Sequence, residues 1–409
     1  MSYEVIDGGV TAANGFKAAG VAAGIKYTGR KDMAMIYSEK PAVAAGMFTS
    51  NVVKAAPVKH DMEVVETSPF VQAVVANSGI ANAATGEQGM KVCRETAKAV
   101  AAALAIPENA VLIGSTGVIG DQIPMDRVLP GIAALADALS DTRQAAADAE
   151  AAIMTTDTVP KEIAVRTVIG GKTVTIGGMS KGSGMIHPNM CTMLAYICTD
   201  CSISKEMLDK AAHLDIPDTF NMITVDGDTS TNDTYLLMAN GLAENPVIDS
   251  EGEDFDIFME ALHYVNTYLA RAMAKDGEGA TALFEVKVVN ADTKENAKML
   301  ARSVAGSALC KAAVFGHDAN FGRILCALGY SGAGFDPEKV TLDFESRAGK
   351  VRVFEKGVKT GFSEEEATAV LSEDEVTVVA DMDEGDASAV AYGCDLSYDY
   401  VKINADYRS

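Results

Sequence analysis

The chain has 409 residues, of which 48% are hydrophobic and 22% charged, as in an ordinary globular protein with room for more than one subdomain. It contains 34 lysines and arginines against 57 aspartates and glutamates, a net charge of -23. This excess disfavours nucleic acid and anionic membranes as partners, but a small anionic substrate stays compatible with it because one lysine can dominate a pocket.

The cysteines and the N-terminus bear on location. The chain has seven cysteines, an odd number. Its N-terminus lacks the basic residues and the apolar run of a secretory signal. No apolar run reaches the length of a membrane-spanning helix. We therefore expect free thiols and a cytoplasmic protein. Cys198 and Cys201 have no second ligand pair at zinc spacing, so we predict two incidental thiols and no metal.

Short strands and helices alternate in the first half of the chain. Apolar runs typical of strands occur at 33–37, 42–48 and 72–76, and residues 111–120 are typical of a strand that runs into a glycine-rich turn. Helical periodicity covers 90–104, where Pro107 follows, and most of 127–153. Gly170-Gly171 between the apolar runs 163–169 and 172–176 predicts a β-hairpin.

The second half also mixes the two kinds of element. We expect strands at 192–198, 281–289, 340–344, 350–354, 375–380 and 389–392, and helices at 204–213, 256–275 and 293–315, the last as one long helix. The order has no strict β-α-β alternation, which favours layers of an α+β fold over a doubly wound nucleotide-binding fold.

One stretch stands out, Lys181-Gly-Ser-Gly-Met-Ile-His-Pro-Asn-Met-Cys-Thr-Met-Leu194. Glycines and a Pro-Asn turn signal lead directly into an apolar strand. Thr192 therefore begins a core strand with its hydroxyl toward the loop, a suitable place for a nucleophile. Taken alone, the residues favour the simpler interpretation of a β-branched residue that starts a strand.

The strand-to-turn segment at 111–120 ends in the glycine-rich run Gly114-Ser-Thr-Gly-Val-Ile-Gly120. It lacks the Lys-Ser/Thr of a phosphate loop, and its glycine spacing does not match a dinucleotide fingerprint. Two interpretations remain: an ordinary tight turn, or an oxyanion hole made by the Thr116 hydroxyl and the Gly117 N–H.

The central stretch resembles the self-cleavage segment of the bifunctional ornithine acetyltransferase/N-acetylglutamate synthase family of arginine biosynthesis. Its precursors cut themselves before a threonine in a Lys-Gly-Ser-Gly-Met-Ile…Pro-Asn-Met-Ala-Thr-Met-Leu context; here Cys191 replaces the alanine. Further matches at 15–26, 51–58, 77–83 and 275–281 extend the resemblance over the full length. It implies an α+β fold, a layered α/β/β/α sandwich of the kind found in self-cleaving acetyltransferases and aminopeptidases.

Self-cleavage between Cys191 and Thr192 is the first implication of the resemblance. It would divide the chain into 1–191 and 192–409, which the family assembles as a heterotetramer of two copies of each. The new α-amine, with an ordinary pKa of about 7.7–8.0, would serve as base for the hydroxyl of the same residue. Cys191 is itself a potential nucleophile, and its attack on Met190 would shift the cut by one residue.

The resemblance also implies the reaction and its residues. An acetyl-Thr192 ester would carry the acetyl group from N-acetylornithine to glutamate without a cofactor, and bifunctional members also accept acetyl-CoA; the motifs do not separate the two kinds. Thr116 and Gly117 match the family's oxyanion hole. The implied substrate contacts are Thr155, Lys181, Thr192, Glu278, Asn404 and Ser409, the last in place of a threonine. Lys181 suits an α-carboxylate and Glu278 an ammonium group.

Two other functions remain open on sequence. One is a self-cleaving N-terminal-nucleophile aminopeptidase or amidase, which would release the acyl group to water. The other is a non-catalytic binding protein that stays uncut.

Two further motifs have no assigned role. Asp226-Gly-Asp-Thr-Ser-Thr-Asn232 mimics half a calcium loop, but Thr231 and Leu237 stand where glycine and glutamate are needed; the family has a nearly identical segment near its site. Gly316-His-Asp-Ala-Asn-Phe-Gly-Arg-Ile324 resembles a family motif with three differences, and a structural turn and a site role are equally open.

Overall fold

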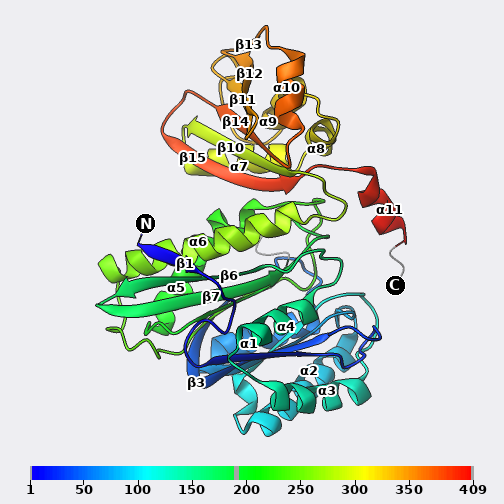
Figure 1. Cartoon of the computed structure of the whole chain (residues 1–409), viewed down its shortest axis with the longest axis vertical. Coiled ribbons are helices and arrows are strands. Elements are labelled where there is room, and N and C mark those ends of the chain that lie inside the picture. Colours follow the sequence, from blue (N-terminus) through cyan, green and yellow to red (C-terminus); the bar gives the residue numbers. More distant parts are fainter. Residues whose placement is uncertain (1, 188–192, 407–409) are drawn as a thin grey trace.

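The computed structural model describes residues 2–187 and 193–406. Figure 1 shows a larger body, which contains the chain as far as the long helix α6, and a smaller lobe above it. Helix α11 (Tyr398–Asp406), which the sequence did not predict, lies beside the junction of the two. Within the described ranges, no helix is long and apolar enough to cross a membrane.

A nine-stranded sheet runs through the larger body, in the order β1-β6-β7-β8-β9-β3-β4-β5 with β2 paired to β3. The sheet divides at β3 (Met33–Phe48), whose first part pairs with β2 and β4 and whose second part pairs with β9. The prediction of two separate strands at 33–37 and 42–48 was therefore wrong. Pro41 is tolerated because the pairing register with β4 shifts between Tyr37 and Ala42, so it interrupts no ladder there. The other strands are β1 (Tyr3–Ile6), β2 (Phe16–Val21), β4 (Val71–Asn77), β5 (Val111–Ser115), β6 (Glu162–Ile169), β7 (Lys172–Lys181), β8 (Leu194–Thr199) and β9 (Thr234–Ala239).

The two halves of this sheet face each other, and helices cover both outer faces. Leu194 and Tyr196 of β8 pack with α4 and the opposite half, whereas Ala195 and Ile197 pack against α5 and α6, as the two-residue period of a strand requires. Helices α2 and α3 cover β4 and β5 on the far side. The predicted α/β/β/α layering is confirmed. The helices are α1 (Ala56–Thr67), α2 (Gly86–Leu104), α3 (Met125–Ala138), α4 (Arg143–Ile153), α5 (Lys205–Asp215) and α6 (Glu253–Lys275), with 3-10 turns at Glu108–Ala110, Ile216–Asp218 and Phe220–Met222.

The predicted hairpin is confirmed and runs to the candidate site. Gly170 and Gly171 both have positive φ, 55° and 78°, as a two-residue hairpin turn of this kind needs. From this turn β7 continues to Lys181, five residues beyond its predicted end at Ile176. The hairpin therefore delivers Lys181 at the end of an ordered strand.

The smaller lobe is a six-stranded sheet, in the order β13-β12-β11-β14-β10-β15, with helices α7 to α10 sharing its core. The prediction of one helix over 293–315 was wrong. Ser307 caps a new helix by accepting a hydrogen bond from Cys310 N at 3.3 Å, so α7 ends before it. The elements are β10 (Leu283–Ala291), β11 (Thr341–Ser346), β12 (Gly349–Glu355), β13 (Val358–Lys359), β14 (Glu375–Asp381), β15 (Ala387–Cys394), α7 (Lys294–Ala305), α8 (Ala308–Phe315), α9 (Phe321–Gly329) and α10 (Glu364–Leu371).

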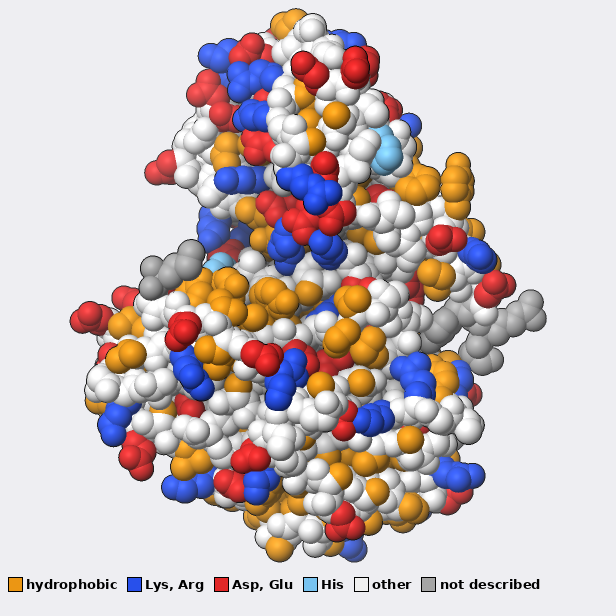
Figure 2. All heavy atoms as spheres, viewed as in Figure 1, with side chains coloured by type: hydrophobic (Ala, Val, Ile, Leu, Met, Phe, Trp, Pro, Cys, Tyr) orange, Lys and Arg blue, Asp and Glu red, His pale blue; other side chains and the backbone are white. Residues whose placement is uncertain are grey.

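Charged side chains gather where the lobe meets the body, as Figure 2 shows. Glu375, the first residue of β14, contacts Arg271 at 2.6 Å and Lys275 at 2.7 Å, both from α6. Pairs this exposed contribute at most about 1 kcal/mol each. They help to orient the lobe but do not by themselves hold it.

Candidate active site

A cavity of about 410 Å³ lies where β5 and β7 end and β8 and β9 begin. Its walls include every predicted site residue that the structure describes: Thr116, Gly117, Thr155, Lys181, Glu278 and Asn404. Met193, which directly follows Thr192 in the chain, is also in the wall. The predicted cleavage residues Cys191 and Thr192, and the predicted contact Ser409, lie outside the described residues.

Thr116 and Gly117 form a turn that packs closely against the backbone of Gly79. Gly117 has φ of 129°, and a Cβ added to it would lie 2.2 Å from the carbonyl carbon of Gly79, so only glycine fits there. Thr116 N donates to Asn77 O at 3.0 Å and Val118 N to Gly79 O at 3.1 Å. None of the described residues accepts a hydrogen bond from the Gly117 N–H, which leaves this donor for a ligand at the cavity wall.

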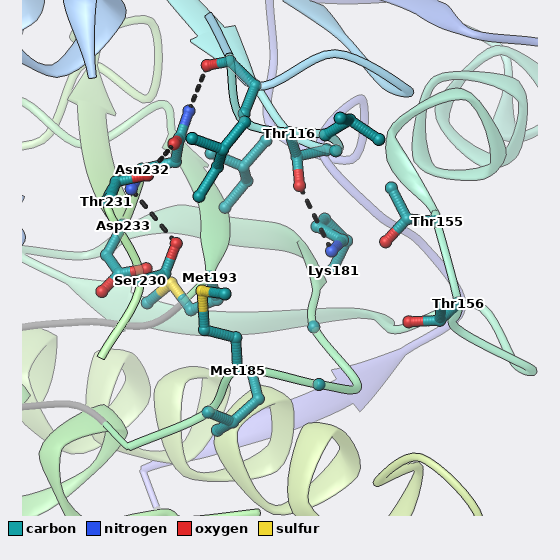
Figure 3. Close-up of a pocket in the computed structure, with 18 of the residues that line it drawn as sticks. Thr116, Thr155, Thr156, Lys181, Met185, Met193, Ser230, Thr231, Asn232 and Asp233 are labelled. Atoms are coloured by element: carbon teal, nitrogen blue, oxygen red, sulfur yellow. Dashed lines mark hydrogen bonds between the residues drawn. The ribbon is translucent and has the colours of Figure 1, made fainter. Parts of the chain in front are cut away.

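Asn232 clamps the strand that leads to this turn. Its side-chain amide donates to Ala81 O at 2.6 Å and to Ser115 O at 2.8 Å, while its Oδ1 accepts from Thr231 Oγ1 at 2.6 Å. Figure 3 shows Asn232 beside Asp233 on the opposite wall of the cavity from Thr155. Segment 230–233 thereby fixes the Thr116 turn relative to the start of β9.

Lys181 projects from the end of β7 toward Thr116, as Figure 3 shows. Its Nζ donates to Thr116 Oγ1 at 3.4 Å and lies 3.8 Å from Asp157 Oδ2. The Lys181 side chain is only 9% exposed. A largely buried ammonium group at the cavity wall is suited to bind a carboxylate.

Behind Lys181 lies a buried ion cluster. Lys161, whose side chain is fully buried, donates to Asp157 Oδ1 at 2.8 Å and to Asp276 Oδ2 at 2.6 Å. Burial alone raises the pKa of the Asp157 carboxyl, but the charges of Lys181 and Lys161 outweigh burial and hold this pKa well below its usual range. The Asp157 carboxylate therefore keeps its charge throughout the neutral range.

Glu278 and Asn404 meet across the cavity. Asn404 Nδ2 of α11 donates to Glu278 Oε2 at 2.8 Å, and Glu278 N donates to Ser183 O at 2.9 Å. A Cβ on Gly184 would lie 2.3 Å from the Glu278 carboxyl carbon, so a glycine is needed beneath this side chain. The cavity thus presents a cation and a carboxylate, the pair that an amino acid requires.

The segment 226–232 supports the loop at 185–187, which follows Lys181. Asp226 accepts from Met185 N at 2.6 Å and from Ile186 N at 2.9 Å, and Thr229 Oγ1 donates to His187 O at 2.9 Å. In the described part of the chain, no three histidine, cysteine, aspartate or glutamate side chains gather to hold a metal. The segment is thus a brace for residues 185–187, a role that its sequence did not disclose.

The motif at 316–324 lies away from this cavity. Arg323 Nη1 donates to Leu309 O at 2.9 Å, and Phe321 stacks on Phe354 with 5.7 Å between ring centroids. These contacts favour the structural interpretation over a site role.

Sequence reasoning missed Asp157, Lys161, Asp276 and Asp233. Asp233 is 1% exposed and lines the cavity next to Met193. Asp157 and Lys161 are four residues apart in the sequence, but both lie in a loop. In a loop, unlike in a helix, this spacing does not predict that two side chains meet. The pairing of Lys161 with Asp276 joins residues far apart in the chain, so no local signal reports it.

Glu150 of α4 offers a test of this buried region. It is fully buried, its Oε1 accepts from Lys161 N at 2.9 Å, and burial raises its pKa to about 8. The unfolded chain ionises this group from about pH 4.5, whereas the native state keeps the proton until about pH 8. The free energy of unfolding should therefore fall as pH rises through this window, by up to about 1.4 kcal/mol per unit.

Glu150→Gln should remove this fall. Urea denaturation at pH 5, 6, 7 and 8 would show the variant gaining stability over the wild type as pH rises. Glu87→Gln, at an exposed position of α2, serves as the control and should track the wild type. A constant difference between Glu150→Gln and the wild type across these pH values would contradict the raised pKa.

The chain matches the family model described as the ArgJ family over residues 17–409. The arginine biosynthesis bifunctional protein ArgJ of Caldanaerobacter subterraneus subsp. tengcongensis is 51% identical over 406 residues, 99% of this chain and 100% of the relative. That of Symbiobacterium thermophilum is 53% identical over 408 residues, again 99% of this chain and 100% of the relative. The crystal structure of arginine biosynthesis bifunctional protein argJ from Bacillus halodurans aligns with a TM-score of 0.50 and 44% identity, covering 52% of this chain and 98% of that chain. With this match over nearly its whole length, the chain belongs to the ArgJ family.

Proposed function

We propose that this enzyme is a glutamate N-acetyltransferase, which carries an acetyl group from N-acetylornithine to glutamate and yields ornithine and N-acetylglutamate. The observation that carries the proposal is the cavity beside Met193, which brings Lys181, Glu278 and the Thr116–Gly117 turn together. An amino-acid substrate needs a partner for its carboxylate and one for its ammonium group, and acyl transfer needs donors for an oxyanion. Relatives named for arginine biosynthesis support the same conclusion.

Activation would begin at the peptide bond before Thr192. Thr192 Oγ attacks the carbonyl carbon of Cys191, the C–N bond breaks, and the hydroxyl proton passes to the new α-amine as an ester forms. Water then hydrolyses the ester, which leaves a carboxylate on Cys191 and a free hydroxyl on Thr192. The α-amine, with an ordinary pKa of about 7.7–8.0, is then available as a base near neutral pH.

Transfer would follow a ping-pong course. The Thr192 amine accepts the hydroxyl proton while Oγ attacks the acetyl carbonyl of N-acetylornithine, and the Thr116 hydroxyl and Gly117 N–H stabilise the oxyanion. The proton moves to the departing amine of ornithine and an acetyl ester remains on Thr192. The α-amine of glutamate then attacks the carbonyl carbon of this ester, the bond between that carbon and Thr192 Oγ breaks, and a proton from the attacking amine passes to Oγ and restores the hydroxyl.

Substrate recognition would use the charged groups of the cavity. We assign the α-carboxylate of the substrate to Lys181 and the ammonium group of the substrate to Glu278. Glu278 Oε2 already accepts a hydrogen bond from Asn404 Nδ2. Thr155 and Ser409 would complete the polar contacts.

The cut would leave the two fragments interlocked. Strand β7 of fragment 1–191 pairs with β8 of fragment 192–409 from Ile176↔Thr199 to Lys181↔Leu194, and β3 of the first fragment pairs with β9 of the second. The Bacillus halodurans chain that aligns with this one covers 52% of it, the length expected of one fragment. We extend the proposal to two copies of each fragment in a heterotetramer.

The acetyl donor and the location complete the proposal. The relatives are named bifunctional, so we include acetyl-CoA as a second acetyl donor, with no metal or cofactor in the reaction. We place the enzyme in the cytoplasm.

An acetyl-transfer assay with and without glutamate tests the function. A transferase forms N-acetylglutamate and ornithine in equal amounts and releases little ornithine when glutamate is omitted. An aminopeptidase-like hydrolase releases ornithine and acetate at the same rate in both cases. A protein of uncut mass that does neither would be the binding protein, and either of the last two results would overturn the proposal.

A further inference from the structure

The loop between α4 and β6 carries a buried carboxylate, Asp157, to which the proposed reaction gives no role. Its side chain is 0% exposed. Oδ1 accepts from Lys161 Nζ at 2.8 Å and from Gly182 N at 2.7 Å. Oδ2 accepts from Thr155 N at 3.0 Å and lies 3.8 Å from Lys181 Nζ. One carboxylate therefore contacts the ammonium group of Lys181, the backbone just after it, and the loop of a second proposed substrate contact.

The distances show how Asp157 divides its interactions. Lys161 Nζ makes the short contacts, at 2.8 Å to Asp157 Oδ1 and 2.6 Å to Asp276 Oδ2. Lys181 Nζ lies 3.8 Å from Asp157 Oδ2, a distance that makes an ion pair rather than a close hydrogen bond. An ammonium group has three donors, and only the contact to Thr116 Oγ1 at 3.4 Å uses one of them among the described residues. Lys181 is therefore oriented by Asp157 and still able to donate to a ligand.

We propose that Asp157 is a positioning residue for the transfer reaction, acting through Lys181. It holds the Lys181 ammonium group and the Gly182 N–H in place, so that the substrate α-carboxylate meets a preoriented cation. The inference rests on the proposed function, because it assigns Lys181 to that carboxylate.

Asp276 provides a matched control. Its side chain is 5% exposed, and it binds the same Lys161 and accepts from Thr158 N at 3.0 Å. Within the described ranges it makes no ion pair with Lys181. Removing its charge disturbs the same buried cluster without touching the ammonium group that faces the substrate.

A double-mutant cycle separates the two roles. Asp157→Asn, Asp276→Asn and Lys181→Met are made singly, and each aspartate variant is combined with Lys181→Met. We expect kcat/KM for glutamate to fall about 10-fold in Asp157→Asn and between about 10-fold and 100-fold in Lys181→Met. The Asp157→Asn/Lys181→Met double variant should be within about twofold of Lys181→Met alone, whereas the effects of Asp276→Asn and Lys181→Met should multiply.

A second acceptor gives a readout that a purely structural role would not move. Glutamate α-amide lacks the carboxylate assigned to Lys181, so Asp157→Asn should lower kcat/KM for glutamate much more than for the amide. Equal losses with both acceptors, or multiplying effects of Asp157→Asn and Lys181→Met, would overturn the inference. If Asp157→Asn fails to fold, Asp157→Ser, which leaves room for a water, replaces it; failure of both while Asp276→Asn folds would show a purely structural role. A wild-type protein that transfers no acetyl group would instead defeat the proposed function, before any variant is compared.

Discussion

Thr192→Ala should leave the chain uncut at 409 residues and should lower the rate of acetyl transfer by at least about 10⁴-fold. Alanine removes the only atom that forms the ester in both steps of the proposed mechanism, the cut before residue 192 and the acetyl transfer. Neither Lys181 nor Thr116 can substitute, because they bind charge and do not carry the acetyl group. Intact mass under denaturing conditions measures the cut, and release of ornithine from N-acetylornithine measures the transfer.

Two companion variants show which atom is responsible. Thr192→Ser keeps the hydroxyl and should retain both the cut and the transfer. Cys191→Ala restores the residue that the family usually has before the cut, and it should be processed with a second fragment that begins Thr-Met-Leu-Ala. If Thr192→Ala were still cut, with a fragment that begins at Cys191, the thiol would be the nucleophile of processing and the proposal for Thr192 would fail.

The sequence predicted the fold where local signals and tertiary structure agree. Gly170-Gly171 specifies its hairpin by itself because both residues need positive φ. The break between α7 and α8 was missed because helical periodicity continues across it. One long helix and two short helices both fit this periodicity, and the Ser307 cap decides for two helices. Helix α11 has no buried residue. It is held by single contacts such as Asn404 to Glu278, which no periodic pattern reports.

The candidate site was predictable only in part, for a similar reason. Lys181 and Thr116 stand within glycine-rich motifs that can be recognised. The structure places Lys181 Nζ 3.4 Å from Thr116 Oγ1. Asp157 has no such motif around it, and its partners Lys161 and Asp276 become neighbours only after folding. Sequence resemblance therefore identifies the groups that would contact the substrate, while those that orient them depend on distances that only the fold provides.

The Thr116 hydroxyl is the second position where a large effect is expected. Thr116→Val replaces the hydroxyl with a methyl group of similar size, and loss of one oxyanion donor should lower kcat for transfer by about 10² to 10³-fold. The fold should tolerate the change because Thr116 is held through its backbone, whose N–H donates to Asn77 O at 3.0 Å. Gly117 cannot be probed as cleanly, since any Cβ there would collide with Gly79. The rate is measured per mole of cut protein, so that slower processing is not counted as slower transfer.

Thr116→Ser is the control, because it keeps the hydroxyl and loses only the methyl group. It should transfer acetyl groups within about tenfold of the wild-type rate, well above Thr116→Val. The KM for glutamate should change little in either variant, since the hydroxyl is assigned to the transition state rather than to the bound amino acid. Equal rates for the valine and serine variants would show that the Gly117 N–H stabilises the oxyanion without Thr116. A raised KM with unchanged kcat in Thr116→Val would instead show that the hydroxyl serves to orient Lys181, 3.4 Å away, for substrate binding.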